Sequence, residues 1–416
     1  NARELKRKIE DIDRKTKKVL DQRFLQEILE IYRKSAKRKV DAIEFEKLIP
    51  FHWGFEFPEV FSLRNDNNSG FDIINGNPPY GNILTEDEKN IMYSYRTVYA
   101  NEIAANFFER SLKILRNEGH MGQIVTNSIA INAGTSSART LIRENMSISR
   151  MALFGTRPAK IFADAEIRVL IFIGCKDAPA TIGTIFTTDA IKFTQKEKAT
   201  LLDKLTFEST DGLILGESKI GDELSDNALP KVGNSIIRNI LLKLKNQSEI
   251  VIKDRINKSD FNEKLQFRKT GGYWLNALEK IPYVSTKIET IKFETALERD
   301  FAIILINSSL VYLYWSTYGN LRDFPLSLLQ KFPFPTIEKL HVHKKTIDGL
   351  RKKLSSCLLS NFIAERGRVG EFRTATCKPV IDEVDELLGK IYSLNKDQVA
   401  YIQNYDKHIR KIELLV

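Results

Sequence analysis

The amino-acid sequence predicts an α/β protein, in which a doubly wound domain is followed by a second domain and by C-terminal helices. Strand-like and helix-like segments alternate between residues 51 and 180, this alternation is lost over residues 181–340, and helical spacing returns over residues 341–416. Such alternation is typical of parallel sheets covered by helices. With 416 residues the chain is also too long for one usual core, so we predict four parts, beginning with a helical connector over residues 1–50.

The first 48 residues are rich in Lys, Arg and Glu and carry Leu20, Phe24, Ile28 and Ile31 at helical spacing. This pattern predicts one or two amphipathic helices. Two roles remain open for them: a solvated connector, or an arm whose cations contact phosphates.

A strand and the polar loop after it are the central local prediction. The apolar run Phe71–Ile74 is bounded by turn residues, a pattern that indicates a strand buried on both faces of a parallel sheet. The loop Asn75–Tyr80 (NGNPPY) follows at the end of the strand where open α/β sheets bind ligands. Further helices are predicted over residues 103–115 and 140–146, and further strands over 123–126, 149–154 and 166–173.

Net charge and the length of the apolar runs indicate which partners the protein has. The formal net charge of +10 and the isoelectric point of about 9.2 suit a polyanionic partner. The apolar run Phe301–Trp315 is interrupted by polar residues and is shorter than the roughly 20 residues of a membrane span, so we predict a core segment and no membrane partner. The first residue is Asn rather than Met, which we interpret as a start inside a longer polypeptide.

Cysteines and histidines give no indication of a metal centre. Cys175, Cys357 and Cys377 are scattered without paired ligand spacing, so neither a disulfide framework nor a zinc site is expected, and a reducing cytoplasm fits best. The five histidines are isolated from one another or lack an acidic or thiol partner nearby, so no metal site is predicted.

Asn77, Pro78, Pro79 and Tyr80 carry the predicted chemistry. The exocyclic amine of adenine is a poor nucleophile, because its lone pair is delocalised into the ring. Two acceptors aimed at its two N–H bonds draw the nitrogen toward tetrahedral geometry, and the Asn77 side-chain oxygen and the Pro78 carbonyl are suited to this role. Consecutive prolines stiffen the loop, and Tyr80 offers a flat face for a base that leaves the duplex.

These residues resemble a known family. The run Gly70–Tyr80 (GFDIINGNPPY), preceded by Phe51–Phe61 (FHWGFEFPEVF), is similar to the catalytic motif region of gamma-class DNA adenine-N6 methyltransferases. The closest similarity is to the type II restriction–modification subgroup in which a methylase is fused to an endonuclease. The resemblance implies methyl transfer from S-adenosylmethionine to the N6 amine of a flipped adenine.

The resemblance covers most of the chain. It continues through Phe107–Asn127 and through Lys160–Ile173, where Phe162 matches a position that stacks on the second face of the flipped adenine. Ile303–Pro335 resembles the end of the family's target-recognition domain, and Ile381–Leu394 its closing helix. The implied fold is an incomplete Rossmann-like methyltransferase domain (residues 51–180), an α+β target-recognition domain (181–340) and a C-terminal helical segment (341–416).

One departure from the family concerns the cofactor. The family holds S-adenosylmethionine with a glycine loop and an acidic residue that both precede the catalytic loop, whereas the residues before Asn77 look helical and contain no such loop. Cofactor-binding residues are therefore not carried over. We expect the sheet to lack its first three strands, a missing N-terminal region or a separate subunit to supply them, and the chain alone to be inactive.

The second domain is expected to bind double-stranded DNA. Basic residues are interleaved with aromatic ones there, and Arg268, Lys269 and Arg322 are the candidates for contacts with phosphates and base edges. About half of these aromatic residues are expected to be core. An alternative remains open, in which the chain is a non-catalytic DNA-specificity or assembly module that retains the Asn77 loop as a relic.

Overall fold

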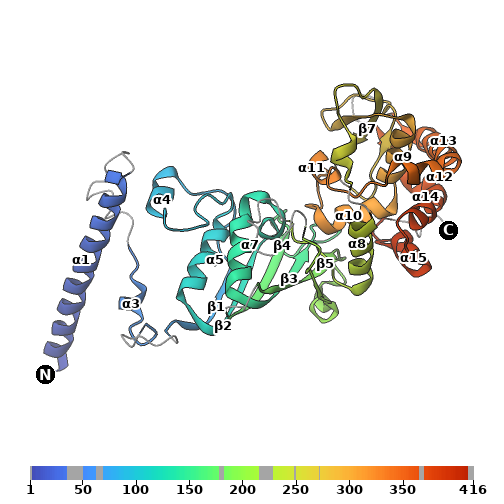
Figure 1. Cartoon of the computed structure of the whole chain (residues 1–416). Helices are drawn as coiled ribbons and strands as arrows, with labels where there is room; N and C mark the ends of the chain where they lie inside the picture. Colours follow the sequence, from blue (N-terminus) through green and yellow to red (C-terminus); the bar gives the residue numbers. More distant parts are fainter. Residues whose placement is uncertain are drawn as a thin grey trace. The chain divides into compact units, whose positions relative to one another are not determined.

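The computed structural model describes residues 2–34, 50–61, 69–177, 182–214, 228–247, 250–270, 272–364 and 370–410 (Figure 1). The chain divides into two compact units. Unit 1 comprises residues 1–124, 134–147 and 173–183, and unit 2 comprises residues 125–133, 148–172 and 184–416. The four predicted domain boundaries stay a prediction.

A mixed six-stranded sheet confirms the predicted α/β class. Its strand order is β1-β2-β4-β3-β5-β6. The pairs β1–β2 and β3–β5 are parallel, and the short β6 is antiparallel to β5. The strands are β1 (Phe71–Gly76), β2 (Leu115–Thr126), β3 (Met146–Phe154), β4 (Val169–Lys176), β5 (Thr184–Ile191) and β6 (Glu208–Ser209). The predicted strands all exist, with ends displaced by several residues.

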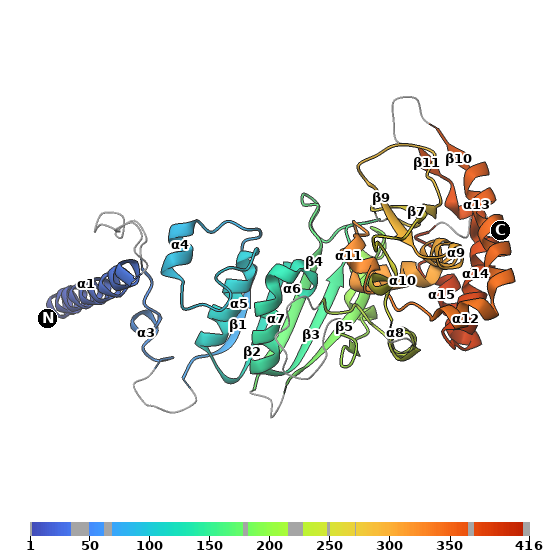
Figure 2. The same ribbon diagram turned by 45° about the horizontal axis from the view of Figure 1, so that its top comes forward.

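Unit 1 also contains the N-terminal helices. They are α1 (Ala2–Lys34), α3 (Trp53–Glu56), α4 (Glu86–Ile91), α5 (Ile103–Ile114) and α7 (Ser136–Asn145). Helix α5 lies beside β1 and β2 in Figures 1 and 2 and packs against α7. Its buried face carries Ala104, Phe108 and Leu112, as the sequence spacing predicts, whereas Phe107, which the same spacing assigns to this face, is 43% exposed. Residues 35–49 of the predicted N-terminal helices lie outside the described residues.

An aromatic cluster fixes the start of β1. The rings of Trp53, Phe57 and Phe61 surround Phe71 edge-on, at centroid distances of 5.8, 5.2 and 5.5 Å. Gly70 precedes this cluster with a φ of +128°, and a Cβ there would lie 2.6 Å from the backbone nitrogen of Arg116. Only glycine avoids that clash, so strand β1 begins in close contact with β2.

The prediction that β1 is buried on both faces is wrong. Ile73 is 63% exposed, and only Phe71 and Ile74 are partly covered among its apolar residues. The reason is position: β1 is first in the strand order, so within the described residues it pairs with β2 alone. An apolar composition that is typical of a central strand thus belongs here to an edge strand.

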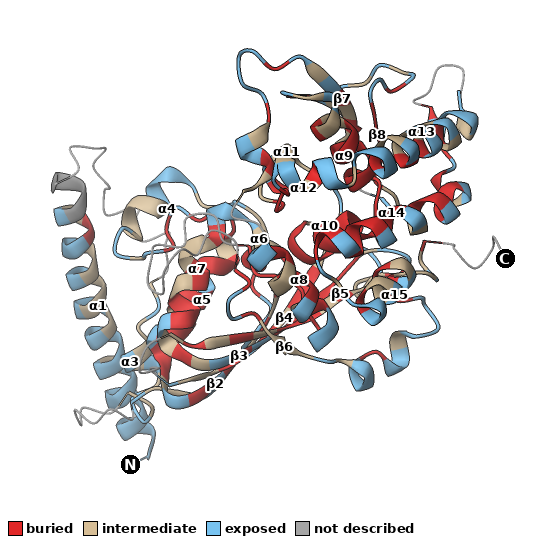
Figure 3. Ribbon diagram, turned by 45° about the vertical axis from the view of Figure 1, so that its right-hand side comes forward, coloured by how far each residue is buried: buried red, intermediate tan, exposed pale blue. Residues whose placement is uncertain are grey.

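Unit 2 is built on a large apolar core. Helices α9 (Ala296–Ile306) and α10 (Ser309–Tyr318) are almost entirely buried, as their red colouring in Figure 3 shows, and this confirms the predicted core segment. No single described helix is long and apolar enough to span a membrane. Helices α9 and α10 together reach the required length and apolar composition, but they are bent by 67° relative to one another. The other helices are α6 (Ser128–Ile131), α8 (Ser235–Gln247), α11 (Leu326–Leu329), α12 (Ile337–Val342), α13 (Lys344–Ser360), α14 (Lys378–Ile391) and α15 (Lys396–Asn404).

Two small sheets complete unit 2. The first is antiparallel with the order β8-β7-β9, and the second is the pair β10–β11. Their strands are β7 (Glu263–Arg268), β8 (Ala277–Leu278), β9 (Ile288–Phe293), β10 (Phe362–Ile363) and β11 (Glu371–Phe372). Helix α9 packs on all three strands of the first sheet.

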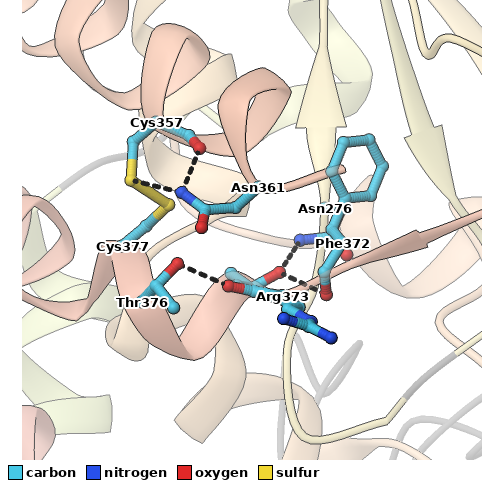
Figure 4. The surroundings of a disulfide bond; sticks show 8 residues. Asn276, Cys357, Asn361, Phe372, Arg373, Thr376 and Cys377 are labelled. Atoms are coloured by element: carbon cyan, nitrogen blue, oxygen red, sulfur yellow. Dashed lines mark hydrogen bonds between the residues drawn. A yellow bond between two sulfur atoms is a disulfide. The ribbon is translucent and has the colours of Figure 1, made fainter. Parts of the chain in front are cut away.

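The expectation that the cysteines form no disulfide is wrong for one pair. Cys357 and Cys377 are joined, with a Cα–Cα distance of 5.9 Å, and Cys175 is free (Figure 4). Cys357 lies near the end of α13, and Cys377 lies just before α14. The antiparallel pair β10–β11 between them turns the chain back, so two thiols that are 20 residues apart in the sequence meet in space.

Candidate functional site

The Asn77 loop, residues 77–80, lies in unit 1 directly after the carboxyl end of β1. Asn77 and Pro79 are exposed, Tyr80 is partly buried and Pro78 is buried. Pro78 and Pro79 have no backbone N–H to donate, so this part of the loop presents acceptors. The predicted placement of a stiff, acceptor-rich loop after a parallel strand therefore agrees with the structure.

Tyr80 and Asn77 are in direct contact. The Tyr80 hydroxyl donates a hydrogen bond to the Asn77 side-chain oxygen over 2.6 Å. Burial, and then the charge of Glu102, raise the pKa of the Tyr80 hydroxyl, so it remains a donor at neutral pH. An amide oxygen has two lone pairs, so Asn77 can accept a second hydrogen bond while Tyr80 holds its orientation.

The exit of the loop is tied to the beginning of α5. The Gly81 backbone N–H donates to the Glu102 carboxylate over 2.6 Å, and the Ile103 N–H donates to the Gly81 carbonyl over 2.9 Å. Gly81 has a φ of +96°, which favours glycine, and Glu102 is only 5% exposed. Sequence reasoning missed Glu102, because an acidic residue before a helix is a common surface feature.

Phe162 belongs to unit 2. It lies in the segment between β3 and β4 and is partly buried. The Phe162 carbonyl accepts from the Ala165 N–H over 3.5 Å, and the neighbouring Ile161 carbonyl accepts from the Lys198 ammonium over 2.7 Å. The structure thus brings Asn77, Pro78, Pro79 and Tyr80 together in unit 1. The role of Phe162 as a second stacking surface stays a prediction.

The three predicted DNA contacts differ in their surroundings within unit 2. Arg268 is half-buried at the end of β7. Lys269 forms an ion pair with Glu289 at 3.0 Å, so part of its charge is already neutralised. Arg322 is exposed and lines a cavity of 680 Å³, to which Arg157 and Arg168 also contribute. Sequence reasoning missed these two arginines, although they flank the run around Phe162.

The described residues before Asn77 do not contain the glycine loop that the family resemblance implies for S-adenosylmethionine. Before Asn77 they form α1, α3 and β1, and no strand followed by a glycine loop is present among them. Most of α1 is exposed; its Ile28 packs against Ile91 of α4, and its Asp21 pairs with His52 at 2.8 Å. We therefore assign no residue of this chain to the methyl donor.

Comparison with known proteins finds a family to which the first part of the chain is similar. Residues 4–162 match the family described as Eco57I restriction-modification methylase. The chain is 29% identical over 297 residues to a type II restriction enzyme and methyltransferase from Methanocaldococcus jannaschii, which covers 68% of this chain and 23% of that protein. A type II restriction enzyme and methyltransferase from Escherichia coli is 33% identical over 108 residues, or 24% of this chain and 11% of that protein.

Among solved structures, the type IIL restriction-modification enzyme MmeI in complex with DNA matches 82% of this chain and 57% of its own, with 14% identity and a TM-score of 0.44. The chain spans less than a quarter of the length of either curated relative. Residues 4–162 are therefore similar to the Eco57I restriction-modification methylase family, and 297 residues of the chain are similar to a type II restriction enzyme and methyltransferase.

Proposed function

We propose that this chain is the target-base and DNA-recognition part of a site-specific DNA methyltransferase of a restriction–modification system. It methylates the N6 amine of an adenine that is swung out of the duplex, with S-adenosylmethionine as the methyl donor. The observation that carries the proposal is the Asn77 loop: an exposed amide and two prolines at the carboxyl end of a parallel strand, in a chain that is similar to a methylase family.

Asn77 and Pro78 act on the adenine amine. The Asn77 side-chain oxygen and the Pro78 carbonyl each accept a hydrogen bond from one N–H group of the adenine amine. These bonds localise the nitrogen lone pair for attack on the methyl carbon. Tyr80 orients Asn77 through the 2.6 Å hydrogen bond, so the acceptor is in place before the base arrives. Bound S-adenosylmethionine would supply the electrophilic methyl group: its S–CH₃ bond would break, with the electron pair going to sulfur, as the N–CH₃ bond forms and one N6 proton leaves to solvent.

Tyr80 and Phe162 serve as the two stacking surfaces for the extruded base. Arg322 contacts the DNA strand, and the net charge of +10 suits the same polyanionic partner. Both assignments are supported by partial exposure of the side chains and by their chemistry.

A second candidate function is a DNA-specificity or assembly module without catalysis of its own. The exposed apolar edge strand β1 favours it, since Ile73 is 63% exposed and the outer edge of β1 is unpaired within the described residues. Such an edge suits pairing with a further strand from an N-terminal region or a second chain. The two candidates differ in whether the Asn77 loop performs chemistry.

The test is methyl transfer by the chain alone and by the complete reading frame that contains it. Tritiated S-adenosylmethionine and genomic duplex DNA without N6-methyladenine are the substrates, and incorporated label is identified as N6-methyladenine by nucleoside analysis. We expect the complete protein to be active and Asn77→Ala to lower its activity at least 100-fold, as loss of one preorganised polar group does elsewhere. Asn82→Ala, at another exposed asparagine five residues on, is the matched control.

The outcomes separate the two candidates. Label that disappears in Asn77→Ala and persists in Asn82→Ala supports the methyltransferase. Specific DNA binding without any incorporated label, or incorporation that is unaffected by Asn77→Ala, overturns the catalytic assignment in favour of the module.

A further inference from the structure

Unit 2 contains a cavity in which three arginines converge. The cavity has a volume of 680 Å³, and Arg157, Arg168 and Arg322 line it. Arg157 and Arg168 come from the segment between β3 and β4, whereas Arg322 follows α10, more than 150 residues later in the sequence. Residues from two distant segments are thus brought to one place by the fold of unit 2.

The three guanidinium groups are held close together at an energetic cost. Burial, and then the charge of Arg322, lower the pKa of the Arg168 guanidinium, although it remains protonated. The Arg168 Nε atom is buried and has no hydrogen-bond partner within the described part of the chain. Arg157 and Arg322 are exposed, and no ion pair of theirs is found among the residues that the structure describes.

The other charges at the cavity leave this positive charge in excess. Lys192 also lines it, but its ammonium is bound to the Asp406 carboxylate and to the Tyr312 hydroxyl. Of the two carboxylates that act on Arg168, Glu166 is exposed and pairs with Lys160 at 3.2 Å, and the other belongs to Asp323. Three guanidiniums therefore face two carboxylates, one of them shared with a fourth cation.

The aromatic residues of the cavity indicate which ligand fits. Trp315 is 2% exposed and donates its Nε1–H to the Asp323 carbonyl, and Tyr312 is 1% exposed. Their ring faces are covered, so they form a floor and offer little surface for stacking a base. Arginine forks are matched instead to phosphate oxygens, which they contact in a bidentate manner.

We propose that this cavity binds a phosphate group of the DNA backbone, with Arg157, Arg168 and Arg322 as its donors. This inference rests on the proposed function, because it takes DNA as the source of the phosphate. The partly buried Arg168, whose Nε atom is buried, fixes where the phosphate sits, and the exposed Arg157 and Arg322 close on it from the rim. A backbone contact of this kind fixes the register of a DNA strand without reading its sequence.

The experiment measures duplex DNA binding as a function of salt. Fluorescence anisotropy gives the dissociation constant of the full chain between 50 and 200 mM KCl, for the wild type and for Arg157→Gln, Arg168→Gln and Arg322→Gln. We expect about 10-fold weaker binding at low salt for each variant, and a slope of log K against log salt that is reduced by about one. Arg373→Gln, at an exposed arginine elsewhere in unit 2, is the matched control and should leave both values unchanged.

A second measurement is independent of DNA. Inorganic phosphate and chloride are compared at equal ionic strength for their effect on the thermal unfolding of each protein, which also shows that the variants fold. We expect phosphate to raise the melting temperature of the wild type and of Arg373→Gln, and to raise it less in the three cavity variants.

The outcomes distinguish failure of the phosphate site from failure of the proposed function. If the wild type binds DNA and the cavity variants match Arg373→Gln in affinity and slope, the phosphate site is refuted and the proposed function is untouched. If DNA does not bind but phosphate stabilises only proteins with an intact cavity, the site takes free phosphate and the DNA-binding function fails. If phosphate acts no differently from chloride and DNA does not bind, the cavity inference is overturned.

Discussion

At the scale of single residues, the most informative contact is the one between Tyr80 and Asn77. The sequence assigns a stacking role to Tyr80, and the structure adds a hydrogen bond from its hydroxyl to the acceptor oxygen of Asn77. One side chain thus has two physical tasks. A ring provides surface for the base, and a hydroxyl orients the amide that polarises the amine.

Two substitutions separate these tasks. Tyr80→Phe keeps the ring and removes the hydroxyl, so we expect it to lower the rate of methyl transfer with little change in DNA affinity. Tyr80→Ala removes the ring as well and should weaken binding of the flipped base by about 1–3 kcal/mol. The fluorescence of 2-aminopurine at the target position reports base extrusion, and normal methyl transfer by Tyr80→Ala would refute the role of Tyr80.

Glu102 provides a test of how the loop is anchored. Glu102→Ala leaves the Gly81 N–H without its acceptor, and loss of a hydrogen bond to a buried charged group costs about 1.5–3 kcal/mol. We expect faster hydrogen exchange at the Gly81 amide and lower methyl-transfer activity. Glu102→Gln retains an acceptor oxygen and should restore slow exchange, whereas equal exchange in all three proteins would exclude the anchor.

Among helices and strands, the periodicity of apolar residues predicts which of the two a segment forms better than it predicts how that segment is buried. The apolar run at β1 and the spacing of α5 predict a strand and a helix, because these patterns are local. Whether a strand is central or at an edge depends on its neighbours in the sheet, which the run itself does not encode. The same holds for Gly70, whose need for glycine arises from the backbone of Arg116 on another strand.

The disulfide between α13 and α14 leads to a prediction about stability. It closes a loop over a separation of 20 residues, for which the chain-entropy argument gives about 3 kcal/mol. A reducing agent, or Cys357→Ala together with Cys377→Ala, should lower the melting temperature. Cys175→Ala should behave as wild type under both conditions, and a melting temperature that is insensitive to reduction in the wild type would indicate that the bond does not contribute.

At the scale of the whole molecule, buried charge makes stability depend on pH. Burial raises the pKa of Asp385 to about 7, and burial together with Asp406 raises that of Asp189 to about 6. Burial lowers the pKa of the Lys231 ammonium to about 7. A raised carboxyl pKa contributes stability below the unfolded value near 3.9 and loses it as pH rises through the folded value.

Asp385→Asn tests this dependence. The Asp385 side chain accepts from the Ser309 N–H over 3.0 Å, and an asparagine oxygen can do the same without titrating. We expect the unfolding free energy of the wild type to fall relative to Asp385→Asn by up to about 1.4 kcal/mol per pH unit between pH 4 and 7. Denaturant unfolding at several pH values measures it, with the exposed Asp397→Asn as control. Parallel curves for wild type and Asp385→Asn would contradict the assignment.

Local sequence patterns are sufficient to predict the α/β class, the loop Asn77–Tyr80 and the apolar core segment that forms α9 and α10. Each depends on residues that are adjacent in the chain, where side-chain periodicity and turn chemistry act locally. Three features instead follow from long-range packing: the edge position of β1 among the described strands, the Glu102 anchor and the pairing of Cys357 with Cys377. These features depend on which distant segments meet, and that is set by packing of the whole core rather than by any local pattern.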